Sequence, residues 1–175
     1  MSRHLILGGA RSGKSSLAQQ LAQASTLPVV LIATAQAGDD EMVARIERHR
    51  RSRPPEWSVI EEPVSLARTL STLVRPDRFV VVDCLTLWLA NLLLEPAEGE
   101  LFPRERAALL DLIPRLVGPL AMVSNETGLG VIPMGAINRR FVDESGLLHQ
   151  QLARLCDRVT LMVAGLPLTL KGSPS

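Results

Sequence analysis

The sequence predicts an α/β fold built on a mainly parallel sheet. Short apolar runs alternate with stretches of helical pattern, which is typical of consecutive βαβ units. A glycine-rich turn joins the first apolar run to the first helical stretch. The apolar runs lack a strict polar–apolar alternation, as expected of strands that are buried on both faces. We therefore expect three layers, with helices on both faces of the sheet.

The expected strands are short and are bounded by polar, glycine or proline residues. They are His4–Leu7, Val29–Ala33, Phe79–Asp83, Leu120–Ser124 and Val159–Val163. The expected helices are Lys14 to about Ala24, roughly Asp40–Arg51, Pro63–Leu73, Leu85–Leu94, Pro103–Val117 and Gly135–Cys156, with Gly146 as a candidate break in the last. Pro54 and Pro55 exclude a helix between Arg51 and Trp57. Residues Glu95–Phe102 are expected to form an exposed loop.

The bulk properties indicate one ordinary domain over residues 1–175, without repeats or linkers. Lys and Arg (19) nearly balance Asp and Glu (18), so a general attraction to nucleic acid or membranes is not expected. Cys84 and Cys156 form no metal-binding spacing and are expected to be small buried hydrophobes. A signal peptide and an apolar run long enough to span a membrane are both lacking, so we expect a cytoplasmic protein.

The glycine-rich turn matches the P-loop pattern G-x-x-x-x-G-K-[ST] through Gly8, Gly13, Lys14 and Ser15. Glycines let the backbone turn tightly and bring N–H groups onto phosphates, and the following helix N-terminus adds positive potential. Lys14 is expected to reach the β and γ phosphates, and Ser15 to ligate Mg²⁺. The alternative is a glycine-rich turn without a ligand. The strand–turn–helix context favours a site for a nucleoside triphosphate and transfer of part of it.

Asp83 ends an apolar run, Phe79–Asp83, that reads as a buried strand. An acid at the carboxyl end of such a strand can hold Mg²⁺ in P-loop enzymes. Asp is also a favoured N-cap for a helix, and one is expected to begin at Leu85. Both roles are compatible, and the P-loop favours the metal role.

His49 lies among five arginines in the nine residues from Arg45 to Arg53. One interpretation is a solvated basic helix end, where cations suit the dipole. The other is an anion site in which the imidazole attacks phosphorus and guanidinium groups stabilise the developing charge. The flanking positive charge would favour the neutral, nucleophilic imidazole.

Two further segments follow apolar runs. Ser124–Gly130 is expected to line the ligand crevice, because loops at strand carboxyl ends do so in open α/β sheets; a plain turn is the alternative. Glu61 and Glu62 precede an expected helix, and either caps that helix or contacts a sugar or base. An Asn-Lys-x-Asp guanine-reading motif is absent.

Taken together, these segments resemble one family, the bifunctional adenosylcobinamide kinase/adenosylcobinamide-phosphate guanylyltransferases of cobalamin biosynthesis. The resemblance extends over nearly the whole chain. It is carried by Gly8–Ser15, Ile32–Ala35, Asp40–Met42, Arg45-Ile46 with His49, Arg53-Pro54, Trp57, Glu61, Asp83–Thr86, Asn91–Leu93, Ser124–Gly130 and Arg140–Asp143.

The resemblance implies a RecA-like P-loop NTPase fold and two reactions. ATP or GTP phosphorylates the terminal hydroxyl of adenosylcobinamide; GTP then guanylylates a histidine, and GMP passes to the adenosylcobinamide phosphate. The histidine corresponds to His49, and Lys14 is the catalytic lysine. The implied nucleotide contacts are Gly8, Gly9, Ala10, Arg11, Ser12, Gly13, Lys14, Ser15, Ala33, Thr34, Ala35, Arg50, Arg51, Ser52, Arg53, Glu61 and Asp83. The family also implies a homo-oligomer, with a trimer favoured.

The chain departs from the family pattern at two places. Leu148-His149-Gln150 stands where the family typically has Leu-Asn-Gln, and Thr127 replaces a more usual Val. Two other functions fit the P-loop alone. One is a single-function kinase of another small alcohol; the other is a nucleotide-dependent switch, which the missing guanine-reading motif disfavours.

Overall fold

The sheet has seven strands in the order β3-β2-β4-β5-β1-β6-β7 within the residues that the computed structural model describes, which are 2–36, 54–94 and 100–173. All neighbouring strands are parallel except β6 and β7, which are antiparallel. The strands are β1 (Arg3–Gly8), β2 (Val29–Ala33), β3 (Ser58–Glu61), β4 (Phe79–Asp83), β5 (Leu120–Asn125), β6 (Arg158–Val163) and β7 (Leu166–Lys171).

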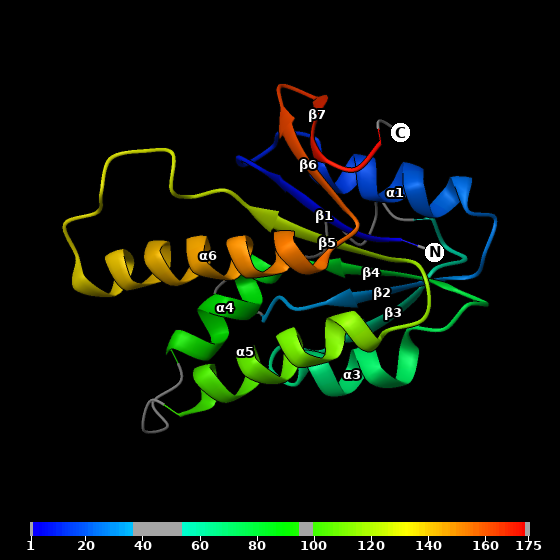
Figure 1. The fold of residues 1–175 in the computed structure, drawn as a ribbon, viewed down its shortest axis with the longest axis horizontal. Helices are drawn as coiled ribbons and strands as arrows, with labels where there is room; N and C mark the ends of the chain where they lie inside the picture. Colours follow the sequence, from blue (N-terminus) through cyan, green and yellow to red (C-terminus); the bar gives the residue numbers. More distant parts are fainter. Residues whose placement is uncertain (1, 37–53, 95–99, 174–175) are drawn as a thin grey trace.

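Helices cover both faces of this sheet, as Figure 1 shows. One face carries α1 (Lys14–Ala24). The other carries α3 (Leu66–Leu73), α4 (Leu85–Leu94), α5 (Leu101–Leu112) with a short 3₁₀ turn η1 (Ile113–Arg115), and α6 (Ala136–Leu155). The expected three-layer α/β arrangement is confirmed.

Alternation along the strands divides the core into two parts. Leu5 and Leu7 of β1 pack with α3–α6, whereas Ile6 between them packs with α1. Successive side chains of a strand point to opposite faces, so each central strand contributes to both layers. The largest fully buried side chain is Trp88 of α4, whose indole N–H donates to the Val64 carbonyl at 2.7 Å.

The five expected strands are all present, with ends that differ by at most one residue. Strands β3 and β7 were not expected. β3 is only four residues long and lies at one edge of the sheet. β7 follows a two-residue turn, Ala164-Gly165, in which both residues have positive φ (51° and 83°). Such turns close hairpins, but Ala is a rare first residue there, so the signal was weak.

Helices α1 and α4 have the expected bounds, and α6 runs through Gly146 without a break. α3 begins at Leu66 instead of Pro63, because the Glu62 carboxylate accepts the N–H groups of Val64 and Ser65 (3.0 and 2.7 Å) just before the helix. The helix expected over roughly 40–51 lies outside the described residues.

The expected exposed loop over 95–102 is wrong at its end. Leu101 and Phe102 belong to α5, and the Phe102 ring is buried in the core. Because this pair lies in a largely polar stretch, the sequence did not indicate that its apolar side chains pack in the core at the start of the helix. The α-helix also ends early, at Leu112, where Pro114 lies in the 3₁₀ turn.

Two smaller expectations concern cysteines and membranes. Cys84 and Cys156 are free and buried, as expected. Burial raises the pKa of the Cys156 thiol to about 12. Among the described helices, none combines the length and hydropathy needed to cross a bilayer.

An ion pair joins the start of β1 to the start of β6. The Asp157 carboxylate accepts from the Arg3 backbone N–H (2.8 Å) and from two guanidinium nitrogens (3.0 and 2.7 Å). The Asp157 N–H in turn donates to the Arg3 carbonyl at 2.9 Å. These hydrogen bonds from Arg3 lower the pKa of Asp157 from 3.8 to about 2.

We predict that Asp157→Asn lowers the free energy of unfolding by about 1 kcal/mol at pH 7, since the pair is partly solvent-exposed. A carboxyl whose pKa is lower in the folded state stabilises above its unfolded pKa and loses this contribution as pH falls. The difference from wild type should therefore shrink between pH 4 and pH 2 in urea titrations. Asp77→Asn, which alters a carboxylate that is 71% exposed, is the control. A difference that persists at pH 2 would contradict the assignment.

Candidate functional site

The parallel register of the strands brings the predicted site residues together at the carboxyl ends of the strands. Ala33 at the end of β2 lies opposite Glu61 on one side and Asp83 on the other. Gly8 at the end of β1 lies opposite Asn125 at the end of β5. Because these strands all run in the same direction, residues from four distant parts of the chain meet where parallel α/β sheets bind ligands.

The turn after β1 follows a path that favours glycine. Gly8 and Gly13 have φ of 151° and 100°, and Arg11 has φ of 55°. A Cβ on Gly8 would lie 2.5 Å from the Met162 carbonyl oxygen and 2.6 Å from Ser12 Oγ. Glycine is therefore required at the first position of the P-loop by close packing as well as by conformation.

Hydrogen bonds within the turn fix the lysine. The buried Lys14 donates from Nζ to the Gly9 carbonyl at 2.6 Å, and the Ser12 N–H donates to the same carbonyl at 3.3 Å. The aliphatic stem is thus held against the loop, with its ammonium group at the turn. This is the place from which a P-loop lysine reaches phosphates.

Polar groups that suit a phosphate remain at this turn. Gly13 is the N-cap of α1 and makes no side-chain cap, so no side chain caps the first N–H groups of the helix there. Ser12 Oγ is buried and has no hydrogen-bond partner among the described residues. A buried hydroxyl without a partner costs stability unless a ligand supplies one. The turn therefore fits an anion.

The turn between β6 and β7 contacts the P-loop and holds it in place. The Gly165 N–H donates to the Ser12 carbonyl at 3.0 Å, and a Cβ on Gly13 would lie 3.3 Å from both the Gly165 Cα and the Met162 methyl carbon. The sequence interpretation missed this support. Its only signal was Gly165 between two apolar runs near the end of the chain.

Ser15 and Asp83 line the same small pocket between α1 and the sheet, together with Gln19 and Trp57. A hydroxyl and a carboxylate are oxygen ligands of the kind that Mg²⁺ prefers. In the described ranges, no group of three or more His, Cys, Asp or Glu side chains could hold a metal. The donor set suits a cation that completes its coordination with nucleotide oxygens and water.

Thr34 ties the end of β2 to the start of α4. Its hydroxyl donates to the Cys84 carbonyl (2.6 Å) and accepts from the Cys84 N–H (3.0 Å), while its own carbonyl accepts from Asn91 Nδ2 (2.8 Å). The Thr34 N–H donates to the Asp83 carbonyl at 3.2 Å. The hydroxyl and the backbone N–H of this buried residue together hold the backbone of Asp83 and Cys84, which are joined by a cis peptide bond.

The two neighbouring glutamates separate into different environments. Of the two expected roles, Glu62 has that of capping the helix. Its carboxylate accepts from the Ser65 N–H and also from the Thr69 hydroxyl at 3.0 Å. Glu61 is exposed at the edge of the sheet. His49 and the four positions Arg50, Arg51, Ser52 and Arg53 lie outside the described residues.

The segment after β5 reaches the P-loop, as its position in the chain predicts. The Glu126 N–H donates to the Gly8 carbonyl at 3.0 Å. The Glu126 carboxylate accepts the Gly128 N–H at 2.7 Å, which closes a turn. The two interpretations of Ser124–Gly130 are therefore compatible, since it is a turn that borders the site.

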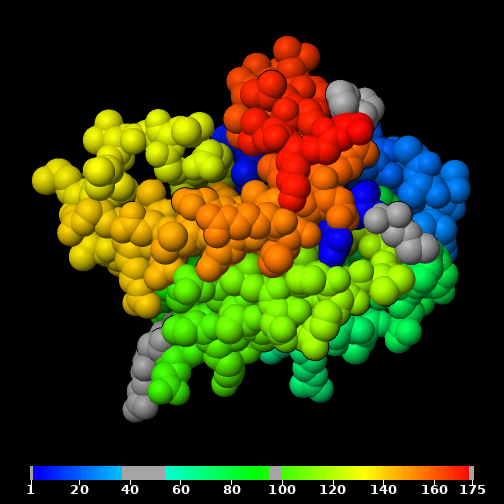
Figure 2. Space-filling view, in the orientation of Figure 1, coloured from blue at the N-terminus to red at the C-terminus, as the bar shows by residue number. Residues whose placement is uncertain are grey.

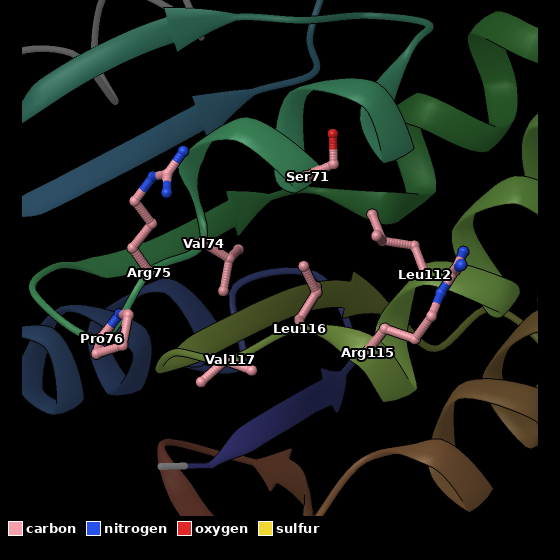
Figure 3. A pocket seen from close by; sticks show the side chains of 8 residues that line it. All are labelled: Ser71, Val74, Arg75, Pro76, Leu112, Arg115, Leu116 and Val117. Atoms are coloured by element: carbon pink, nitrogen blue, oxygen red, sulfur yellow. The ribbon is translucent and has the colours of Figure 1, made fainter.

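A second hollow lies at the opposite, amino edge of the sheet, between the ends of α3 and η1 (Figure 3). Arg75 and Arg115 border it, and each donates from Nε to a carbonyl of its preceding helix, Thr72 or Asp111. None of the predicted nucleotide-binding residues that the structure describes lines this hollow. The candidate site remains at the carboxyl edge.

The model of the family described as cobinamide kinase / cobinamide phosphate guanyltransferase matches residues 4–170. The bifunctional adenosylcobalamin biosynthesis protein CobP of Pseudomonas aeruginosa is 56% identical over 98% of this chain and 99% of its own length. The corresponding CobU of Escherichia coli is 36% identical over 95% of this chain and 98% of its own length.

Solved structures resemble the fold at low sequence identity. The P4 protein of bacteriophage phi6, in complex with ADP, superposes with a TM-score of 0.51 at 19% identity, over 95% of this chain and 54% of that chain. The RadB recombinase superposes with a TM-score of 0.50 at 17% identity, over 91% and 73%. These matches confirm the expected RecA-like P-loop fold.

We predict that Gly8→Ala lowers the free energy of unfolding by about 2–4 kcal/mol, because the methyl group would press on the Met162 carbonyl and Ser12. Gly9→Ala is the matched control, since a Cβ at Gly9 would meet no atom within 4 Å. Its stability should stay within about 0.5 kcal/mol of wild type. Urea unfolding measures both variants. Equal stabilities of the two would show that Gly8 is not closely packed in solution.

Proposed function

The chain belongs to the cobinamide kinase/cobinamide phosphate guanyltransferase family, and from this premise we propose how its residues carry out the two reactions. It is a bifunctional transferase of cobalamin biosynthesis. The observation that carries the proposal is the P-loop, with its closely packed Gly8, a fixed Lys14 and an uncapped helix N-terminus. We place the chemistry in the cytoplasm, where nucleoside triphosphates are available.

In the first reaction, the terminal hydroxyl of adenosylcobinamide attacks the γ-phosphorus of ATP or GTP. The bond to the nucleoside diphosphate breaks, and the hydroxyl proton is released. Backbone N–H groups of Gly9–Ser15 and the Ser12 hydroxyl hold the phosphates. The Lys14 ammonium exchanges its present contact with Gly9 for the β and γ oxygens, where it stabilises the charge of the transition state.

Ser15 and Asp83 are the residues that would hold Mg²⁺ beside these phosphates. When bound, the cation neutralises charge on the β and γ oxygens. Asp83 is placed for this by the register of β4 with β2 and by the Thr34 hydrogen bonds around Cys84. In this proposal Ala33, Thr34 and Ala35 border the nucleotide through their backbone path, because the Thr34 hydroxyl is already used within the protein.

In the second reaction, an imidazole nitrogen of His49 attacks the α-phosphorus of GTP, and pyrophosphate leaves. A phosphate oxygen of adenosylcobinamide phosphate then attacks the same phosphorus, the P–N bond breaks, and adenosylcobinamide-GDP forms. Arg50, Arg51, Ser52 and Arg53 would bind the phosphates together with the P-loop, and the positive charge around His49 would favour its neutral form. Exposed Glu61 would contact the sugar or base.

We also propose a homo-oligomer, with a trimer favoured. The apolar loop, Leu129, Val131, Ile132 and Met134, projects from the body beside the start of α6 (Figure 2). Val131 and Met134 are each 96% exposed. Contiguous exposed apolar side chains are characteristic of protein interfaces. A second copy of this chain is the partner that the family resemblance implies.

We predict that incubation with GTP and Mg²⁺ adds one GMP moiety to the protein, because the His49 imidazole is the proposed acceptor. Intact-mass spectrometry measures the adduct, and peptide mapping should place it on the peptide that contains His49. His49→Asn should gain no mass. His4→Asn, whose change lies at the amino end of β1 and away from the site, should gain GMP as wild type does. An unlabelled wild type, or labelling that survives in His49→Asn, would refute the covalent route.

A further inference from the structure

A buried polar network lies between α4, β5 and α6, beside the segment that borders the site. It consists of Thr86, Ser124 and His149, which are buried, and of Glu126, which is partly exposed. The four side chains come from three elements and from the segment after β5. Neither reaction as derived above uses Thr86, Ser124 or His149.

Hydrogen-bond contacts connect Thr86, Ser124 and His149, whereas His149 Nδ1 faces Glu126 without a hydrogen-bond partner among the described residues. The Asn125 N–H donates to Thr86 Oγ1 at 2.6 Å, and Thr86 Oγ1 lies 3.2 Å from Ser124 Oγ. Ser124 Oγ lies 2.7 Å from His149 Nε2. On the other side of the ring, His149 Nδ1 lies 3.6 Å from Glu126 Oε2.

Donors and acceptors can be assigned so that each hydroxyl donates one hydrogen bond. Thr86 accepts from Asn125 and donates to Ser124, and Ser124 donates to His149 Nε2. The ring proton then resides on Nδ1 and faces the Glu126 carboxylate. Burial lowers the pKa of His149 against the opposing effect of Glu126, so the neutral imidazole that this assignment needs is favoured.

This network ends at the P-loop. Glu126, its last member, donates its backbone N–H to the Gly8 carbonyl, and Asn125 pairs with Gly8 across the β1–β5 ladder. The network therefore fixes three consecutive residues, Ser124 to Glu126, at the first glycine of the phosphate cradle.

The order Ser, His, carboxylate is also that of hydrolytic triads, in which the serine is the nucleophile. That role does not fit here. Ser124 is 1% exposed, so no substrate reaches its hydroxyl. The network holds backbone in place and performs no covalent chemistry.

We propose that His149 is a positioning residue for the family reactions, which holds the segment after β5 on the P-loop through Ser124 and Glu126. The inference rests on the proposed function and extends it to a residue far along the chain. The P-loop itself is held by contacts independent of His149, from Gly165 to Ser12 and from Lys14 to Gly9. Loss of His149 should therefore affect turnover more than nucleotide affinity.

The experiment measures kcat and KM for GTP in the kinase reaction, with unfolding curves for each variant. His149→Leu should lower kcat about tenfold and change KM less than about twofold, since small misplacement of a site weakens catalysis. His149→Gln retains a polar atom near the position of Nε2, and it should restore most of kcat by renewing the contact with Ser124.

His4→Leu is the matched control. His4 is also buried, and its Nε2 lies 2.8 Å from the Thr160 hydroxyl, but at the amino end of β1. It should lose stability as His149→Leu does, and keep kcat within about twofold of wild type, because it lies outside the site.

The results either support or overturn the positioning role of His149. An unchanged kcat in folded His149→Leu, or an equal loss in His4→Leu, would overturn the positioning role. If His149→Leu fails to fold, Ser124→Ala replaces it: a lower kcat supports the proposal and an unchanged one overturns it. A wild-type protein that fails to phosphorylate adenosylcobinamide would instead refute the proposed function, which keeps the two failures distinct.

Discussion

The site depends on how closely three strand ends approach one another at Gly8. The Gly8 carbonyl accepts from Glu126 after β5, and its Cα faces the Met162 carbonyl of β6 at a distance that leaves no room for a side chain. Interiors packed this tightly do not deform gradually, so the path of the following turn is largely fixed before a ligand arrives. The phosphate cradle is thus a consequence of sheet packing, and its preorganisation is supplied by the core on both faces.

The polar groups around this contact divide into two kinds. Those that build the frame, such as the Thr34 hydroxyl and the Glu62 carboxylate, are hydrogen-bonded within the protein. Ser12 Oγ and the uncapped start of α1 have no such side-chain partners in the described parts of the chain. Buried polar groups are normally paired, so an unpaired buried hydroxyl at a turn that suits phosphate marks a place where a ligand can supply the partner. The other buried polar atoms without a partner in the described residues, His149 Nδ1 and Gln151 Oε1, lie in α6.

The sequence predicted those features of the fold that are determined by local sequence pattern. The P-loop, the five central strands and the helices α1 and α4 follow from glycine spacing and apolar runs, and parallel register then places Glu61, Ala33 and Asp83 together. Edge strands were missed because β3 is short and because the Ala164-Gly165 turn lacks the usual hairpin residues. The contacts of Gly165 with Ser12 and of His149 with Ser124 join residues more than twenty positions apart. No periodicity records such contacts, although His149 was visible as a departure from the family pattern.

In the proposed function, one phosphate cradle serves both the kinase and the guanylyltransferase reactions. This sharing is tested most directly by measuring the two turnover numbers of Lys14→Ala separately. Lys171→Ala is the control, because the chain has two lysines and Lys171 donates only to carbonyls near the end of α6 in the contacts recorded for it. We expect both turnover numbers of Lys14→Ala to fall about 100-fold or more, since charge stabilisation is lost in each transition state, and those of Lys171→Ala to stay near wild type. Guanylyl transfer that stays near wild type while phosphorylation collapses would contradict the shared use of one cradle.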